Sequence, residues 1–290
     1  MLNSQPILSV VVPISKMSGR LFHLSSWLKD IEFQDCEVIL VHDINDADTA
    51  PELEELMLSL ANPNLRLFSG HWGNPGGPRN HGLSRAQGEW VAFWDSDDLP
   101  KVLDVLANLK DSSEFDLLVG SFQVIDSVTG KVASTVLAED IHDIYFNPGI
   151  WRMAFKAEIL KGIVFPELSM GEDQVFLLTL KLYNLNVKLS NVIFYRYFRN
   201  NPKQLTTQPS AIIDLRITIK MTFDFFRCAE QREKDYVGLM LVRQCITLLK
   251  RTPYLGLVAS IPVFAHLAFF ETTLFVRILR QIQVKFLGSL

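Results

Sequence analysis

The sequence predicts an α/β fold, with a mostly parallel central sheet flanked by helices and a helical C-terminal extension. Two observations lead to this prediction. Over the first hundred residues, short apolar runs typical of strands alternate with segments whose apolar residues recur at helical spacing. From about residue 211 onward, nearly all of the sequence has helical character. We therefore expect an α/β domain over residues 1–210 and a helical extension over 211–290.

Strands are predicted at residues 7–12, a continuous apolar run rich in β-branched residues, and at the short runs 37–41, 65–68 and 90–94. Helices are expected between them, at 20–31, from 51 to about 60, and at 77–87. The second half predicts strands at 116–124, 131–137 and 187–197, and helices at 150–161 and 173–184. Ligands bind beyond the carboxyl ends of parallel strands, so the loops after the first four strands should converge on one crevice.

Composition excludes several classes of protein. The chain has 290 residues, of which 48% are apolar and 21% charged, which indicates a globular protein. A net charge of -4 and a pI of about 5.9 argue against a nucleic-acid partner. Three widely spaced cysteines form no CxxC pair, so neither a zinc site nor a disulfide framework is expected. The N-terminus lacks the pattern of a signal peptide, which favours a cytoplasmic location.

An acidic cluster, Asp95-Ser96-Asp97-Asp98, follows the fourth strand. Crowded carboxylates repel one another, and their usual stabilising partner is a hard divalent cation. Mn²⁺ or Mg²⁺ fits this pattern, with one or two carboxylates as ligands and substrate phosphates completing the shell. A solvated turn is the alternative, with Asp98 capping the next helix.

The residues around the cluster decide between these interpretations. Residues 73–98 read GNPGGPRNHGLSRAQGEWVAFWDSDD, in which Arg79-Asn80, Gly82 and the run 86–89 (AQGE) precede an apolar strand and the acidic cluster. This order resembles the inverting family-two glycosyltransferases, which have the GT-A fold. The similarity is good over about residues 7–110 and patchier to about 206. It implies metal-dependent transfer of a sugar from a nucleotide-diphosphate donor to a hydroxyl.

The resemblance also implies roles by position. Pro13 and Asp43 would border the nucleotide base, and Arg79 would lie near the nucleotide or its diphosphate. Asp97 would be the most direct metal ligand. Asp95 would hold the ribose or the water around the metal, and is the second candidate ligand.

The sequence departs from the family after the first two strands. His42 replaces one Asp of the usual turn, and Ile44 replaces its glycine. Ser15-Lys16 stands where an aromatic residue and Asn are usual. These departures leave the choice of nucleotide open. They also support an alternative function, a non-catalytic nucleotide-sugar or glycan-binding relative that acts as a partner subunit.

A second acidic motif, Glu172-Asp173, opens a predicted helix. Inverting transfer needs a general base that deprotonates the acceptor hydroxyl. Acidic residues at a helix start more often only complement the helix dipole. The family, however, places Glu-Asp at a comparable distance after its Asp-x-Asp motif. The resemblance therefore implies Asp173 as the base and Glu172 as the residue that orients the acceptor.

Two further segments are candidate parts of the site. Arg196 and Arg199, before a polar loop with Gln204-Leu205-Thr206, could bind the donor diphosphate, because guanidinium suits phosphate. A surface strand with alternating cations is an equal alternative. Trp151 could stack on the acceptor sugar.

The most apolar segment, residues 254–278, is interrupted by Pro262, His266 and Glu271 and flanked by cations. It predicts either an interfacial helix, giving peripheral contact between residues 253–290 and the inner face of the cell membrane, or a helical hairpin packed on the core. The family and this segment together imply a glycan or lipid-linked saccharide acceptor in cell-surface polysaccharide synthesis. A nucleotidyltransferase is less favoured, because residues 13–19 lack a convincing Gly-rich, Lys-bearing loop.

Overall fold

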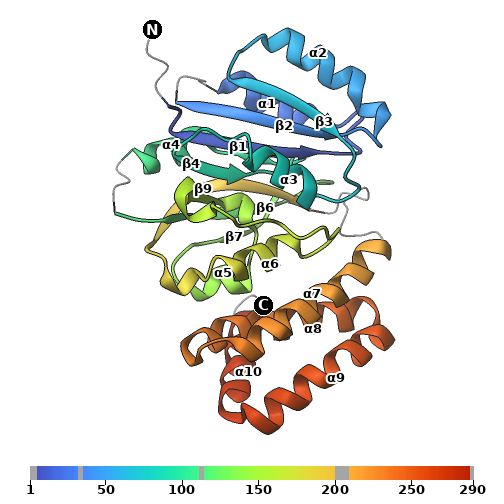
Figure 1. Cartoon of the computed structure of the whole chain (residues 1–290), viewed down its shortest axis with the longest axis vertical. Helices are drawn as coiled ribbons and strands as arrows, with labels where there is room; N and C mark the ends of the chain where they lie inside the picture. Colours follow the sequence, from blue (N-terminus) through green and yellow to red (C-terminus); the bar gives the residue numbers. More distant parts are fainter. Residues whose placement is uncertain (1–4, 32–34, 111–113, 200–208, 288–290) are drawn as a thin grey trace.

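The computed structural model describes residues 5–31, 35–110, 114–199 and 209–287. A mixed sheet forms the upper part of the molecule in Figure 1, and the C-terminal helices lie below it. The strands are β1 Leu8–Ile14, β2 Cys36–Asp43, β3 Leu65–Gly70, β4 Trp90–Phe93, β5 Leu99–Pro100, β6 Leu117–Asp126, β7 Val132–Val136, β8 Met153–Lys156 and β9 Val187–Arg199.

The helices lie between and after these strands. The α-helices are α1 Phe22–Asp30, α2 Ala50–Leu60, α3 Gly76–Leu83, α4 Val102–Leu109, α5 His142–Phe146, α6 Glu172–Thr179, α7 Pro209–Cys228, α8 Gln231–Arg251, α9 Pro253–Phe270 and α10 Thr272–Leu287. Short 3-10 turns occur at Ala47–Thr49, Ile150–Arg152, Ala157–Leu160 and Leu182–Asn184.

The sheet has the strand order β3-β2-β1-β4-β8-β6-β9-β5, and β7 pairs with β6. The first four strands in this order are parallel, as the alternating sequence predicts. From β8 onward the pairing is mixed: β8 is antiparallel to both β4 and β6, whereas β6 and β9 are parallel. The first half of the sheet therefore supplies the parallel edge at which a ligand is expected.

Helices cover both faces of the parallel strands. Alternate residues of each strand point to opposite faces, so each strand contributes side chains to two cores. Val10, Leu40 and Trp94 belong to a core shared with α1, α2 and α4. Val11 and Phe93 belong to a second core, which continues into α6 and the C-terminal helices. These continuous apolar strands are buried on both faces, as in other parallel sheets.

The predicted helix at 150–161 is wrong. Met153–Lys156 forms β8 between β4 and β6, and the residues on either side form 3-10 turns. Its residues 153–155 are all apolar, and periodicity alone cannot distinguish such a short apolar run in a strand from one in a buried helix. Pairing with two neighbouring strands decides the conformation of this segment.

The run 86–89, which carries part of the family resemblance, is held in place by hydrogen bonds to β1 and β2. The Gly88 N–H donates to the Ser9 Oγ at 2.7 Å, and the Gln87 N–H donates to a Glu37 carboxylate oxygen at 2.6 Å. Glu37 also accepts hydrogen bonds from the Ser9 hydroxyl and from Arg66. A Cβ atom at Gly88 would lie 2.6 Å from the Ser9 nitrogen, so only glycine fits. This buried network fixes the entry into β4 at its amino end.

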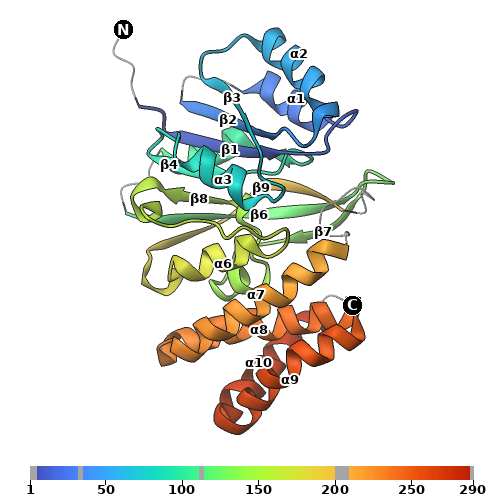
Figure 2. The ribbon, with the colours of Figure 1, turned by 45° about the vertical axis from the view of Figure 1, so that its right-hand side comes forward.

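The C-terminal helices pack on the α/β part. Figures 1 and 2 both place α7 and α8 between α6 and the outer pair α9 and α10. An ion pair between Lys234 and Glu271, and another of 3.1 Å between Arg277 and Asp235, tie α8 to the end of α9 and to α10. The helices after α7 are thus packed on α8, which is one of the two arrangements that the sequence left open.

Candidate active site

A cavity of about 1000 Å³ opens at the carboxyl ends of β1, β2 and β4. Its wall continues through the loop before α3, the start of α6 and one side of α8. Most of the site residues expected from the sequence line this one cavity: Pro13, Asp43, Arg79, Asp95, Asp97, Glu172 and Asp173. Arg196 and Arg199 are not among the lining residues.

The acidic cluster divides into two kinds of carboxylate. Asp95 and Asp97 are half-buried and line the cavity. Asp98 is buried, and its Oδ1 accepts a hydrogen bond of 2.7 Å from the Phe198 N–H on β9. Asp98 is therefore not a helix cap. The next helix begins at Val102 with no side-chain cap, and Asp98 instead joins the cluster to β9.

Burial and the charge of Asp95 raise the pKa of Asp97 to about 6. A carboxylate in this state gains from a nearby cation. Among the described residues, no group of three or more His, Cys, Asp or Glu side chains could enclose a metal ion. Asp95 and Asp97 nevertheless fit Mn²⁺ or Mg²⁺, which often take one or two protein carboxylates and complete their shell with phosphate and water.

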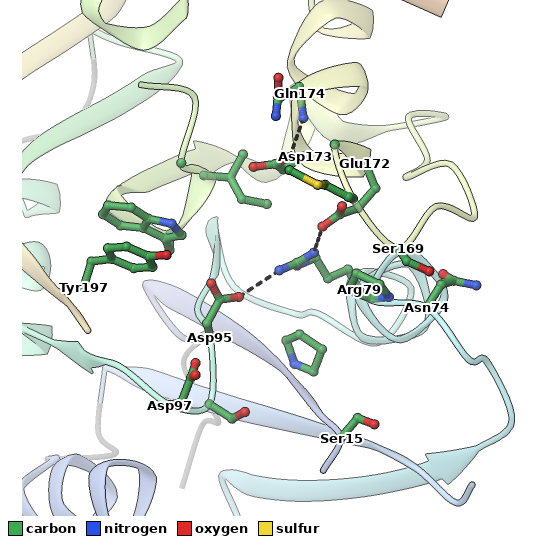
Figure 3. Close-up of a pocket in the computed structure, with 18 of the residues that line it drawn as sticks. Ser15, Asn74, Arg79, Asp95, Asp97, Ser169, Glu172, Asp173, Gln174 and Tyr197 are labelled. Carbon is green, nitrogen blue, oxygen red and sulfur yellow. Dashed lines mark hydrogen bonds and ion pairs between the residues drawn. The ribbon is translucent and has the colours of Figure 1, made fainter. Parts of the chain in front are cut away.

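Arg79, on α3, joins the two acidic motifs. Its Nη2 donates to Asp95 Oδ1 at 2.8 Å, and its Nη1 donates to Glu172 Oε1 (Figure 3). Burial lowers the pKa of Arg79, but the charges of Glu172 and Asp95 outweigh this effect and leave the pKa raised. Arg79 thus stays charged and holds together two carboxylates more than 70 residues apart in the sequence, one after β4 and one at the start of α6.

Two contacts position the second acidic motif. Asn80, next to Arg79, exchanges hydrogen bonds with the backbone of Phe165 at 2.9 and 2.7 Å and so anchors the loop leading to α6. The Thr218 hydroxyl on α7 donates to the Met170 carbonyl at 2.9 Å. Gly171 has φ of +86°, which suits glycine, and a Cβ there would lie 2.6 Å from Thr218. Helix α7 therefore fixes the turn from which α6 begins.

Glu172 and Asp173 differ in their surroundings. Glu172 is buried and paired with Arg79. Asp173 is half-buried, and its Oδ1 accepts the N–H of Gln174 at 2.8 Å. Burial and the neighbouring charge of Glu172 raise the pKa of Asp173 to about 7. Asp173 can therefore gain or lose a proton near neutral pH, and a general base needs this property.

Asp43 and His42 organise the other end of the cavity. Asp43 accepts hydrogen bonds from the Asn45 N–H and side chain at 3.1 and 2.8 Å, and from the Gly73 N–H at 2.7 Å. His42 is buried, and its Nε2 donates to the Asp46 carbonyl at 2.9 Å. The histidine that departs from the family pattern thus closes the turn after β2, and Asp43 remains at the cavity wall.

An aromatic cluster forms another wall. The ring of Trp151 stacks on Tyr197 at 5.4 Å with an interplanar angle of 2°, and on Tyr195 at 4.6 Å. Trp151, Tyr197 and Phe122 line the cavity. A side chain at Gly149 would collide with the indole, at 2.5 Å. This cluster contributes aromatic rings to the cavity that the carboxylates also line.

Arg196 and Arg199 lie on β9. Tyr195 and Tyr197 point to Trp151, so strand alternation turns Arg196 to the opposite face of the sheet. Arg199 is exposed at the end of β9. The segment 204–206 expected to accompany them lies outside the described residues. Binding of phosphate by these two arginines stays a prediction.

The cavity includes residues that the sequence analysis missed. Helix α8 contributes Arg243, Gln244, Thr247 and Arg251 to the wall. One signal was available: Arg243, Gln244 and Thr247 interrupt the mostly apolar run from Val237 to Leu249. Polar residues inside an apolar helical run need a partner or a function. Without the fold, nothing in the sequence connects them with Asp173.

The sequence profile described as "Glycosyl transferase family 2" matches residues 18–163. This match spans half of the chain, and it includes Arg79 and the acidic cluster at 95–98. The fold and the composition of the cavity agree with it. The chain belongs to glycosyl transferase family 2.

Relatives extend the comparison beyond the profile. The chain is 26% identical over 223 residues to the glycosyltransferase GlyG of Streptococcus pneumoniae, covering 70% of this chain and 74% of the relative. It is 31% identical over 198 residues to the poly(ribitol-phosphate) β-N-acetylglucosaminyltransferase TarS of Staphylococcus aureus, covering 64% of this chain. The match spans 34% of TarS, so most of TarS lies outside the aligned region.

Solved structures show the same GT-A fold. Residues 1–349 of S. aureus TarS in complex with UDP-GlcNAc superpose with a TM-score of 0.64 at 23% identity, covering 83% of this chain and 72% of that one. The mannosyltransferase PcManGT from Pyrobaculum calidifontis, in complex with GDP-Man and Mn²⁺, has a TM-score of 0.58 at 16% identity, covering 93% and 81%. At these identities the likeness concerns the fold.

Proposed function

We propose that this protein is a metal-dependent inverting glycosyltransferase that moves a sugar from a nucleotide-diphosphate donor to a hydroxyl of a glycan or lipid-linked saccharide. The observation that carries the proposal is the bridge made by Arg79. It brings the acidic cluster at the end of β4 and the acidic motif at the start of α6 into one cavity. A transferase needs these two groups together, one at the leaving group and one at the acceptor.

The chemistry follows from this arrangement. Asp173 takes the proton of the acceptor hydroxyl, and the oxygen attacks the anomeric carbon of the donor sugar. A new carbon–oxygen bond forms on one face as the bond to the diphosphate breaks on the other, so the anomeric configuration inverts. Arg79 holds Glu172 and Asp95 in place during this step. Glu172, fixed by that pair, orients the acceptor.

The donor lies toward the strand ends in this proposal. Pro13 and Asp43 would border the base, and Asp97 and Asp95 would hold Mn²⁺ or Mg²⁺. A bound divalent cation stabilises the negative charge that develops on the leaving nucleotide. The raised pKa of Asp97 supports this assignment, because a carboxylate crowded by another acid gains from a cation.

The acceptor lies toward Trp151 and Tyr197, whose ring faces suit a sugar. Poly(ribitol-phosphate) transferases and a transferase acting on GalNAc(5)-diNAcBac-PP-undecaprenol are among the similar proteins, so we propose an acceptor in cell-surface polysaccharide synthesis. The solved relatives include complexes with UDP, UDP-GlcNAc and GDP-Man. UDP-sugars are therefore the first donors to test, followed by GDP-mannose.

The direct test is release of nucleoside diphosphate from a panel of sugar nucleotides, with Mn²⁺ or EDTA and with undecaprenyl-linked saccharides or wall polymers as acceptors. We expect acceptor-dependent release with at least one donor, abolished by EDTA. Absence of release with every donor and acceptor, combined with intact donor binding, would instead support the non-catalytic alternative.

We further propose that the C-terminal helices contact the inner face of the cell membrane from the cytoplasm. Within the described residues, α9 is the helix whose length and composition would allow it to cross a membrane, and only 22% of its residues are buried. Leu257, Ile261 and Phe269 are more than half exposed on it. Replacing Leu257 and Ile261 by Ser should reduce recovery with anionic lipid vesicles and leave folding intact. Unchanged recovery would contradict this contact.

A further inference from the structure

One side of helix α8 forms a wall of the cavity. Arg243, Thr247 and Arg251 are spaced by four residues and therefore share one face of the helix. The Nη2 of Arg243 donates to Gln174 Oε1 at 3.3 Å, so this arginine lies beside the start of α6. Figure 3 shows Gln174 and Asp173 at one end of the cavity and Ser15 and Asp97 at the other. The wall formed by α8 is thus on the acceptor side of Asp173.

Arg243, which is half-buried, differs from Arg79, which is buried in the same cavity. Arg79 has two carboxylate partners, at Asp95 and Glu172. Arg243 forms no ion pair with any carboxylate in the described part of the chain, and its Nε is buried without a hydrogen-bond partner. Burial lowers the pKa of Arg243 to about 10, which still leaves it charged at neutral pH. A guanidinium that has lost much of its contact with water normally has an anionic partner.

Asp173 is not in direct contact with Arg243 as an ion-pair partner. Its Oδ1 is engaged by the Gln174 N–H, and its charge acts on Arg243 only through space. The nucleotide diphosphate is not that partner either, because in the proposed function the diphosphate lies at the opposite end, beside Asp95 and Asp97. The remaining molecule that reaches this wall is the acceptor.

We propose that Arg243 binds an oxyanion of the acceptor, a phosphate or a carboxylate, close to the hydroxyl that Asp173 deprotonates. The inference rests on the proposed function and adds the charge of the acceptor to it. A guanidinium can hold such a group through two parallel N–H bonds, which fixes orientation as well as position. Gln244 and Thr247 add polar side chains to the same wall. Arg243 is thus a specificity-determining residue that selects an anionic acceptor.

The test measures binding of small probes by NMR titration, with UDP or GDP and Mn²⁺ present at saturation so that the donor phosphate site is filled. The probes are glycerol 3-phosphate, glycerate and neutral glycerol. The variants are Arg243→Gln and Arg243→Lys. Arg232→Gln is the control, because Arg232 is an exposed cation on the same helix that does not line the cavity.

We expect one of the two anionic probes to bind, and glycerol not to bind. Arg243→Gln should weaken that binding by about tenfold to a hundredfold, the range for loss of a charged hydrogen bond. Arg243→Lys should recover part of it, and Arg232→Gln should change nothing. The tighter of glycerol 3-phosphate and glycerate identifies the phosphate or the carboxylate as the group recognised.

Equal binding of the anionic probe to the wild-type protein and to Arg243→Gln would overturn the inference. So would an Arg243→Gln variant that shifts only the pH profile of turnover, because Arg243 would then act on Asp173 alone. Failure of the proposed function has a different signature, namely that neither nucleotide binds the wild-type protein.

Discussion

Replacing Arg79 by Met tests how much the bridge between the two acidic motifs contributes to stability. The substitution leaves Glu172, whose side chain is 8% exposed, without its cation. It also removes a partner of Asp95, which is 29% exposed and so loses less. Removing one partner of a buried ion pair costs about 3–5 kcal/mol, and we expect a value near the lower end because Glu172 can take up a proton. A loss of about 3 kcal/mol lowers the melting temperature by about 6–12 °C in a protein of this size.

The loss should depend on pH. Arg79 lowers the pKa of Glu172, so its removal raises that pKa further above the unfolded value. Below the unfolded pKa, Glu172 is protonated in both states and needs no cation. The destabilisation is therefore small near pH 4, grows as the pH rises toward the new pKa, and is largest above it.

The assay is urea denaturation of the wild-type, Arg79→Met, Glu172→Gln and double-variant proteins at pH 5 and pH 8. We expect a coupling free energy of about 1–3 kcal/mol between the two sites at pH 8 and a smaller one at pH 5. Arg85→Met, which changes an exposed arginine outside the cavity, should alter stability by less than about 0.5 kcal/mol. Additive effects, or a loss independent of pH, would refute the role assigned to the bridge.

Three other changes have defined outcomes. Asp173→Asn should reduce transfer by about 10²–10⁴-fold with donor binding unchanged, measured by product formation and calorimetry, and undiminished transfer would exclude Asp173 as the base. Because burial and Glu172 raise the pKa of Asp173, the wild-type rate should increase with pH up to about 7 and then level off; a flat profile from pH 5 to pH 8 is incompatible with this base. Gly88→Ala, whose Cβ would meet the Ser9 nitrogen at 2.6 Å, should lower the free energy of unfolding by about 1–3 kcal/mol in urea, and an unchanged midpoint would show that the turn can shift.

The parallel half of the fold was predictable because local sequence determines it. β1, β2 and β4 are continuous apolar runs, and their burial on both faces is what such runs indicate. Because these strands are parallel, the acidic residues that follow β2 and β4 in the sequence must lie at the same edge of the sheet. Trp94, the last residue of the apolar run at 90–94, also lies in the core, where it is 1% exposed.

The parts that could not be predicted depend on contacts between distant residues. β8 is a strand because β4 and β6 pair with both of its edges. Asp98 accepts a hydrogen bond from the backbone of Phe198, 100 residues away, and Asn80 donates one to the backbone of Phe165, 85 residues away. Neither partner has a sequence pattern that points to the other. Arg243 belongs to the site only because α7 and α8 pack beside α6, which no periodicity in the sequence reveals.

The central claim is that Asp97 and a divalent cation hold a nucleotide-diphosphate sugar in this cavity. Calorimetric titration of UDP-sugars and GDP-mannose, with Mn²⁺ or with EDTA, tests it most directly. The matched variants are Asp97→Asn and Asp104→Asn, the second changing an exposed carboxylate on α4 that lies outside the cavity. We predict that one donor binds in Mn²⁺, that EDTA and Asp97→Asn both weaken binding by about tenfold or more, and that Asp104→Asn leaves it unchanged. Two results would contradict the account. One is donor binding that neither EDTA nor Asp97→Asn weakens relative to the wild-type protein in Mn²⁺. The other is that no sugar nucleotide binds.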